Sequence, residues 1–239
     1  IDVKVLDWLK IGMNNSGDVR LQNTVTSGGS GFANAFYNAR RMGPIFPVYA
    51  IDSNGEYIID PLTGSRAFDR GDARFGIPRR PNNTSGRHAP EEMLLNSNYN
   101  ESLFFRTVGF ADFTPIENLS IKISGSVDIG TFNGQFYGNP YVGDYIPEGR
   151  ATKSANFDIT TNFNQLINYS FDIGAANSFD ILVGHENYGE KINDFSAAKT
   201  GYIVLDNPVL DNYTTIASVS SQIDKYRTEG FFSRINYAH

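Results

Sequence analysis

One histidine–glutamate pair in the sequence has the side chains that could hold a catalytic zinc ion. His185-Glu186 resembles the start of the His-Glu-X-X-His helix of zinc peptidases, but Gly189 stands where the second histidine is needed. The other histidines, His88 and His239, show no spacing that fits a serine–histidine–aspartate set. We therefore predict no catalytic residue, no metal site and no cofactor, and a protein that is not an enzyme.

A second short motif resembles the start of a calcium-binding loop. It runs from Asp52 to Glu56, but Tyr57 stands where that loop needs glycine and Thr63 where it needs a bidentate glutamate. Asn-Gly is a strong hairpin signal when apolar runs flank it, as they do here on both sides of Asn54-Gly55. The motif predicts a hairpin turn rather than a calcium site.

Arginines and aromatic residues alternate through a long segment poor in regular pattern, residues 25–96. Guanidinium groups and aromatic rings suit both carbohydrate rings and the carboxylates and carbonyls of peptides. We therefore take six residues as candidates for binding a solute or a partner protein: Arg40, Arg41, Tyr49, Tyr57, Arg79 and Arg80. An alternative is that the arginines of this segment pair with Asp60, Asp69 and Asp72 and only hold it together. A short helix is expected at Phe32 to Arg41.

The elements that must position these residues are β-strands. From Leu119 to Thr131 the odd positions are apolar apart from Gly125 and Thr131, whereas the even positions are polar or glycine, and this period of two is typical of a strand with one apolar face. Similar alternation occurs near residues 9–13, 157–171, 179–186 and 231–237, and 103–114 is strand-like. We predict about six long strands and a remnant before Trp8.

The connections between these strands alternate between short and long. Tight turns are expected at Asp7-Trp8, at Pro115 to Asn118 and at Gly174 to Asn177, whereas residues 25–96 and two loops near 137–153 and 200–222 are longer. Short turns at one end and long loops at the other are the layout of an outer-membrane β-barrel. The polar positions would then face the lumen, and six are candidates to line it: Asp158, Asn162, Asn164, Asp180, Glu186 and Arg234.

Aromatic residues are expected to mark the two interfaces of the membrane. Trp8, Phe113, Phe171 and Phe179 lie beside the short turns, and a second group is placed nearer the long loops. The members of this second group are Phe136, Tyr137, Tyr188 and Tyr226. A soluble carbohydrate-binding β-sandwich, in which these aromatics fill a core, remains the alternative.

Composition narrows the classes of protein further. The 239 residues include no cysteine, which excludes disulfides, thiolate metal sites and a cysteine nucleophile. A sequence pI near 5.1 argues against nucleic-acid binding, which requires a net basic face. The modest hydrophobic content of 40% would fit a soluble protein. It also fits a barrel, because half of each barrel strand faces water.

Four segments resemble, in order, barrel segments of SusC/RagA-type TonB-dependent outer-membrane transporters. They are Asp7 to Gly12, Met42 to Tyr49, Gly184-His185-Glu186, and Tyr226 to Tyr237. The resemblance implies an all-β fold, namely about six to seven antiparallel strands of a transmembrane barrel of about 22 strands, with long extracellular loops such as 25–96. Residues 1–239 would be part of one barrel domain, and nothing in them resembles the plug domain of the family. We therefore expect this chain to be a piece of a longer polypeptide.

The resemblance also implies what the whole transporter does. Such a protein imports an oligosaccharide or peptide nutrient across the bacterial outer membrane, beneath a SusD-like surface lipoprotein that acts as a lid. Its other partners would be outer-membrane lipid and the TonB complex, which would act through an N-terminal part not present here, and transporter–lid pairs would form a dimer. A passive or structural barrel without energy coupling is the other alternative to transport.

Overall fold

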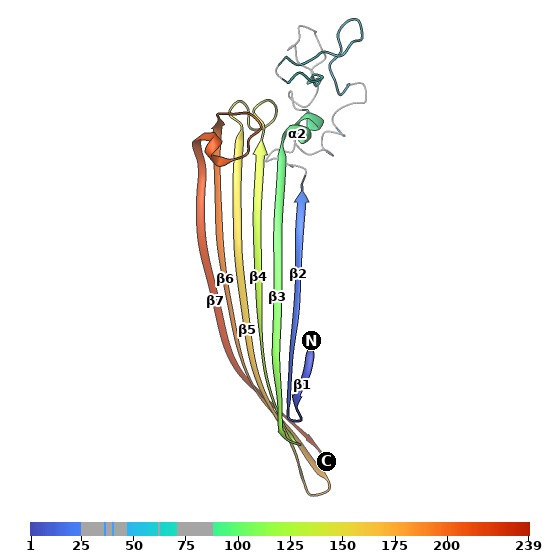
Figure 1. Ribbon diagram of the computed structural model, residues 1–239, viewed down its shortest axis with the longest axis vertical. Helices are drawn as coiled ribbons and strands as arrows, with labels where there is room; N and C mark the ends of the chain where they lie inside the picture. Colours follow the sequence, from blue (N-terminus) through green and yellow to red (C-terminus); the bar gives the residue numbers. More distant parts are fainter. Residues whose placement is uncertain (25–35, 37–39, 41–46, 62, 71–87) are drawn as a thin grey trace.

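Seven antiparallel strands form one sheet in which the strands follow the order of the chain. The computed structural model describes residues 1–24, 36, 40, 47–61, 63–70 and 88–239. The strands are β1 (Asp2–Leu6), β2 (Leu9–Asn23), β3 (Ser97–Ile116), β4 (Leu119–Gly138), β5 (Arg150–Ile173), β6 (Asn177–Tyr202) and β7 (Tyr213–Ala238), and neighbours in sequence are neighbours in the sheet (Figure 1). All six long strands and the short first strand are confirmed.

The register explains why these sequences form strands with two different faces. Ile121 lies opposite Ile167, which in turn lies opposite Val183 on β6, so odd-numbered residues share one face of the sheet. Even-numbered residues share the other face, where Ser124 lies opposite Asn164. We call the first the apolar face and the second the polar face. Because a one-residue slip would reverse every side chain, the alternation fixes this register.

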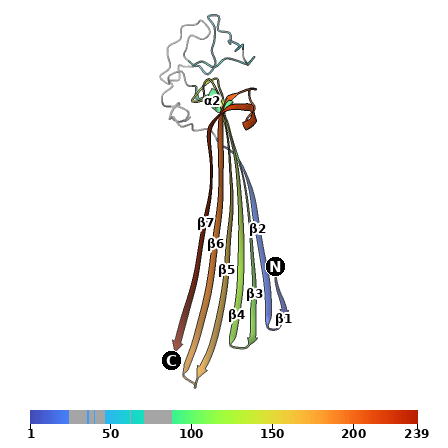
Figure 2. The ribbon, with the colours of Figure 1, turned by 90° about the vertical axis from the view of Figure 1, so that its left-hand side faces the viewer.

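Every extensive contact between strands joins neighbours within the sheet, and no second sheet lies across it in the described part of the chain. Turning the molecule by a quarter shows the strands as a single layer (Figure 2). Ile167 and Val183, on the apolar face, keep exposed fractions of 46% and 50%. The described residues therefore do not form the β-sandwich that was the alternative, and the apolar face needs an apolar environment that these residues do not supply.

The strands are longer than the alternation predicts, and the loops are correspondingly shorter. The loops expected near 137–153 and 200–222 occupy only residues 139–149 and 203–212, because β4 and β5 stay paired up to Gly138 and Arg150, and β6 and β7 up to Tyr202 and Tyr213. A small core lies at this end, where Tyr137, Ala151 and Tyr213 pack with Tyr202 and Leu210.

The short turns lie where the sequence predicts them, at residues 7–8, 117–118 and 174–176. Aromatic rings cluster beside them: Trp8 stacks on Phe113, and Phe171 on Phe179. The second aromatic group is only partly correct. Phe136 contacts Tyr145 near the loops, but Tyr188 and Tyr226 contact each other in the middle of β6 and β7, because these strands continue well beyond them.

The long connection between β2 and β3 spans residues 24–96 and ends in helix α2 (Ala89–Leu95). Helix α2 was not predicted from the sequence, although Pro90 in its first turn and the acidic Glu91 and Glu92 are typical of a helix start. No helix in the described part of the chain is long and apolar enough to span a bilayer.

Candidate functional site

Residues 47–61 and 63–70 of the long connection form three short antiparallel segments. Single bridges join Tyr49 to Phe68, Ile51 to Tyr57, and Ile59 to Arg66. Ala50 donates its backbone N–H to Ala67, which donates to Ile58, which donates back to Ala50. Ala50 and Ala67, which take part in these hydrogen bonds, are both buried.

The turn that begins at Asp52 is a hairpin turn, as predicted. The Asp52 carboxylate accepts the backbone N–H of Asn54 at 2.8 Å and of Glu56 at 2.9 Å, and Gly55 takes the positive φ of 87° that this tight turn requires. The hydrogen bond from Glu56 holds the pKa of the Asp52 carboxyl below its usual value. The carboxylate that would begin a calcium loop thus caps the turn.

Two of the predicted binding residues, Tyr49 and Tyr57, come together on this unit with Phe68 and Arg66. The Tyr49 ring centroid lies 6.0 Å from that of Tyr57, edge to face, and 5.1 Å from that of Phe68. The Arg66 guanidinium lies 4.1 Å from the centre of the Tyr57 ring, a cation–π distance. We call these four residues the aromatic–arginine cluster.

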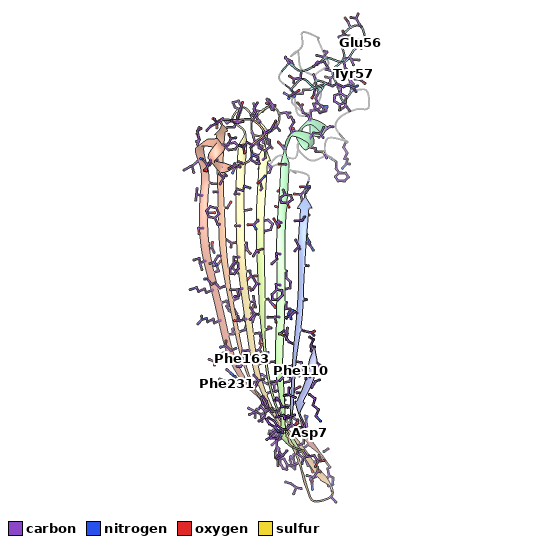
Figure 3. The ribbon with its side chains drawn as sticks, in the orientation of Figure 1. Asp7, Glu56, Tyr57, Phe110, Phe163 and Phe231 are labelled. Carbon is purple, nitrogen blue, oxygen red and sulfur yellow. The ribbon has the colours of Figure 1, made fainter. Side chains whose placement is uncertain are left out.

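The cluster is open to solvent, and it lies far from the short turns. Arg66 is exposed, and Tyr57 has an exposed fraction of 49%. Figure 3 places Tyr57 and Glu56 at the opposite end of the molecule from Asp7, which lies in a short turn. A planar cation beside exposed rings can stack on a sugar ring or a peptide side chain and can bind a carboxylate or carbonyl oxygen.

A buried ion pair fastens this unit to the sheet. Arg70 makes a two-pronged contact with Glu91 of α2, with its Nε donating to Oε2 at 2.7 Å, and its Nη1 donates to the carbonyl oxygen of Tyr141 at 2.9 Å. Burial raises the pKa of the Tyr141 hydroxyl. The expected acidic partners of the loop arginines were Asp60, Asp69 and Asp72. In the described residues Arg70 pairs with Glu91, 21 residues away along the chain, an acidic partner that the sequence did not suggest.

Two further side chains, which no sequence pattern singled out, help to attach α2 to the sheet. His88 caps α2 by accepting the N–H of Glu91 on Nδ1 at 3.2 Å. The side chain of Asn139, which is fully buried, accepts the backbone N–H groups of Tyr141 and Val142. The backbone N–H of Asn139 in turn donates to Oδ1 of Asn96, at the end of α2, at 2.8 Å. These contacts join α2 to the loop between β4 and β5.

Of the remaining binding candidates of the long connection, only Arg40 lies in the part of the chain that the structure describes. Arg40 is exposed, and nothing places it beside Tyr49 or Tyr57. Arg41, Arg79 and Arg80 lie outside the described residues, as does nearly all of the helix expected at residues 32–41. Arg66, which belongs to the same arginine-rich run, takes the position beside the tyrosines instead.

The candidates for a lumen-lining role all lie on the polar face, and all except Asp158 belong to one of two separate groups. Asp180 accepts hydrogen bonds from Asn168, Ser170 and Asn236 at 2.9, 3.0 and 3.2 Å, and its Oδ1 lies 3.6 Å from Nη2 of Arg234. Farther along the strands, Asn162 donates to Glu186 at 3.1 Å, and Asn164 donates to Asn162 at 2.7 Å. Asp158 belongs to neither group and lies opposite Gly130 and Ile192.

His185 and Glu186 point to opposite faces of β6, so they cannot share a metal ion. His185 contacts Gln165 and Glu229 on the apolar face, with Nε2 of His185 2.9 Å from the Glu229 carboxylate. The described residues contain no group of three histidines or acidic residues placed to hold a metal ion.

Comparisons with solved structures show which known fold this sheet resembles. No protein-family model and no curated protein sequence matches the chain. Three structures of RagAB match, one described as a peptide transporter and two as a peptide importer in a "closed-closed" and an "open-open" state, with TM-scores of 0.70, 0.69 and 0.70 at 20%, 20% and 21% identity. Each match covers 99% of this chain and 25% of the solved chain, so the chain spans a quarter of the length of these structures. The fold is that of a segment of an antiparallel transmembrane β-barrel, as predicted.

Proposed function

We propose that this chain is part of a SusC/RagA-type TonB-dependent transporter that imports a peptide or an oligosaccharide across the bacterial outer membrane. The observation that carries the proposal is the fold match to RagAB over nearly the whole chain. The four sequence segments that resemble the same family also support the proposal. Because the RagAB structures are described as a peptide transporter and importer, we take a peptide as the first candidate solute.

The two faces of the sheet support a barrel wall with lipid on one side and water on the other. The apolar face would meet the hydrocarbon, where only a sheet with its backbone groups paired is stable. The polar face would line the lumen, where the Asp180 and Glu186 groups could contact the solute or a plug domain. In both groups the carboxylate accepts a hydrogen bond from a neighbouring asparagine, Asn168 for Asp180 and Asn162 for Glu186, as buried or partly buried polar groups usually do.

The aromatic–arginine cluster would lie at the extracellular mouth. It is at the end of the molecule away from the short turns, which in such barrels face the periplasm (Figure 3). There it could take hold of a peptide beneath a SusD-like lipoprotein lid, with Arg66 binding a carbonyl or carboxylate and Tyr57 stacking on a side chain. No chemical step is needed, so the proposal assigns no catalytic residue and no cofactor.

Peptide uptake by cells that carry single variants of the full-length transporter tests the role of the cluster. Tyr57→Ala and Arg66→Ala should each weaken the apparent affinity for peptide about tenfold, because each removes a stacking or cation–π contact of roughly 1–2 kcal/mol. Tyr99→Ala is the matched control: Tyr99 is a tyrosine of β3 with an exposed fraction of 37%, and it takes part in none of the ring contacts of the cluster. If Tyr99→Ala lowers peptide uptake as much as Tyr57→Ala does, the result would count against a binding site at the cluster.

Energy coupling separates the proposed function from a passive barrel. Uptake by the wild-type transporter should stop when TonB is deleted or the proton-motive force is dissipated. Uptake that continues under both conditions would favour a passive channel. If a deletion strain takes up oligosaccharides normally but loses peptides, the solute is a peptide, and the reverse result assigns an oligosaccharide.

A further inference from the structure

The two faces of the sheet carry charges of opposite sign in the middle of β5, β6 and β7. The stretch concerned is residues 185–198 of β6, together with the residues of β5 and β7 that pair with it. Its polar face holds no lysine or arginine but five acidic residues, namely Asp158, Glu186, Glu190, Asp194 and Asp224. On its apolar face the balance is reversed, with Glu229 against Lys153, Lys191, Lys225 and Arg227. Because both faces belong to the same strands, a general acidity of the segment does not explain this separation.

Four of these acidic residues surround one side chain of β6, that of Ile192. Asp158 and Asp224 lie directly opposite Ile192 on the two neighbouring strands, whereas Glu190 and Asp194 lie two positions before and after it on the same strand. Diagonal neighbours of this kind in an antiparallel sheet are about 7–8 Å apart. Carboxylates at that separation repel one another. We call Asp158, Glu190, Asp194 and Asp224 the acidic patch.

The described chain supplies no cation to the acidic patch. None of its four carboxylates takes part in an ion pair with the described residues. Asp194 and Asp224 accept hydrogen bonds from the uncharged amides of Asn156 and Gln222, at 2.8 and 2.7 Å. One carboxylate oxygen of Asp158 is buried and accepts no hydrogen bond from the described residues. The negative charge of the patch is therefore not neutralised from within this part of the chain.

Two tyrosines on the polar face make the surroundings of the patch suitable for an organic cation. Tyr226 lies directly opposite Glu190 and has an exposed fraction of 55%. Tyr188, two positions from Glu190 on β6, contacts the Tyr226 ring edge to face, with 6.0 Å between the ring centroids. An ammonium or guanidinium group is attracted to the face of an aromatic ring, and a carboxylate beside the ring adds a charge-assisted hydrogen bond.

The spacing of the patch favours a solute with several separated charges over a single metal ion. No three acidic groups of the described residues are placed to hold one metal ion. From Glu190 to Asp194 the patch extends about 13 Å along β6, at about 3.3 Å per residue, and it covers three strands. An extended peptide has a similar repeat and can place basic side chains at several points of such a surface. An uncharged oligosaccharide would leave the carboxylates without a partner.

We propose that the acidic patch, together with Tyr226, selects peptides that carry lysine or arginine side chains. The proposal rests on the proposed function, because it takes the polar face as the lumen wall of a peptide transporter. A basic side chain places its alkyl part on the Tyr226 ring and its charge beside Glu190 or Asp224. The same wall repels an acidic peptide of equal length.

Binding of three matched peptides to the purified full-length transporter tests the proposal. The peptides are identical except at two positions, which hold lysine, glutamine or glutamate. Wild type should bind the lysine peptide about tenfold more tightly than the glutamine peptide, since two solvent-exposed charge contacts together contribute about that factor. The glutamate peptide should bind most weakly. High salt should remove most of the difference, because it screens exposed charges.

Variants of the patch and of the opposite face separate a local effect from one of net charge. E190Q/D224N should lose the preference for lysine but bind the glutamine peptide as wild type does, which also shows that the variant is folded. D158N/E190Q removes another pair of charges from the patch and should behave in the same way. E101Q/E229Q is the matched control, because it removes two carboxylates from the apolar face of the same sheet. It should keep the preference.

Equal, measurable binding of the three peptides by wild type would overturn the proposal. So would a preference that survives in both patch variants, or one that falls equally in E101Q/E229Q. Displacement of the lysine peptide by millimolar calcium at constant ionic strength would show a metal site instead, and would also overturn it. In each of these cases the transporter still binds peptide, so only this inference fails. A transporter that binds none of the three peptides contradicts the proposed peptide transport itself, and this inference with it.

Discussion

The contacts of Arg70 show how a single side chain can hold part of the long connection in place. Its side chain is mostly buried, with an exposed fraction of 11%, and its guanidinium contacts both Glu91 of α2 and the carbonyl oxygen of Tyr141. Leaving a buried charge without its partner lowers the free energy of unfolding by several kcal/mol, whereas an exposed ion pair contributes roughly 0–1 kcal/mol to it. The position of the aromatic–arginine cluster therefore depends more on the buried pair of Arg70 and Glu91 than on any exposed ion pair.

Arg70→Gln should destabilise α2 locally by about 3 kcal/mol, because it leaves Glu91 buried without its partner. Hydrogen exchange of residues 88–96, followed by mass spectrometry in the full-length protein, should become much faster. Arg70→Met combined with Glu91→Leu should restore part of the protection, since it removes both charges. Lys4→Gln breaks a largely exposed pair with Asp7 and serves as the control. Exchange that stays unchanged in Arg70→Gln would contradict this account of the loop.

At the scale of the strand, close approach between neighbouring side chains restricts what the sheet can accept. Gly184 lies opposite Phe232 on the polar face, and a Cβ built on Gly184 would come within 2.2 Å of the Phe232 ring. The ring covers the glycine and fills the space of the missing side chain. Gly230 lies on the same face with open space where its Cβ would be.

Gly184→Val should lower the stability of the assembled barrel by about 1–3 kcal/mol, because the added atoms overlap the Phe232 ring. The measurement is the temperature at which the purified full-length protein loses its compact migration in an unheated gel. Gly230→Val should leave that temperature nearly unchanged. In the double variant Gly184→Val with Phe232→Ala, the two changes should cost less than their sum, and strict additivity would argue against the packing of Phe232 on Gly184.

The strands could be predicted where the two faces differ in polarity, and less well where they do not. The alternation after Leu119 gives both the start of β4 and its register, because membrane-facing and water-facing positions differ strongly there. It fades near Ala151, Ala197 and Ala198, where small residues are buried at the loop end, so the sequence underestimates the length of the strands.

The contacts within the long connection between β2 and β3 cannot be predicted from the alternation of polar and apolar residues. The pairing of Tyr49 with Tyr57 follows from the hairpin at Asn54-Gly55, which is local and was predicted. The pairing of Arg70 with Glu91 depends on how α2 docks against the loop after β4, and no spacing in the sequence encodes that arrangement. For this reason Tyr49 and Tyr57 could be named in advance, whereas Arg70 could not be matched to its partner.

For the whole molecule, strand length and bilayer thickness together set where the membrane lies. β6 and β7 have 26 residues each, whereas about 9 to 11 residues of a tilted strand cross the hydrocarbon. More than half of each strand must therefore stand outside the hydrocarbon. The aromatic–arginine cluster would be held well above the membrane surface, where a solute arrives.

The central claim is that one face of this sheet contacts lipid and the other contacts water, and single spin labels along β4 test it most directly. The chain contains no cysteine, so cysteines at consecutive positions from 120 to 129 can be labelled one at a time in a full-length protein without other cysteines. Collision rates with oxygen, which concentrates in lipid, and with a water-soluble nickel chelate are measured in nanodiscs. Our account predicts alternation with a period of two, in which labels at Ile121, Ile123 and Val127 favour oxygen and labels at Ser120, Ser124 and Ser126 favour the chelate. Equal access of the chelate to both sets, or the opposite phase, would contradict it.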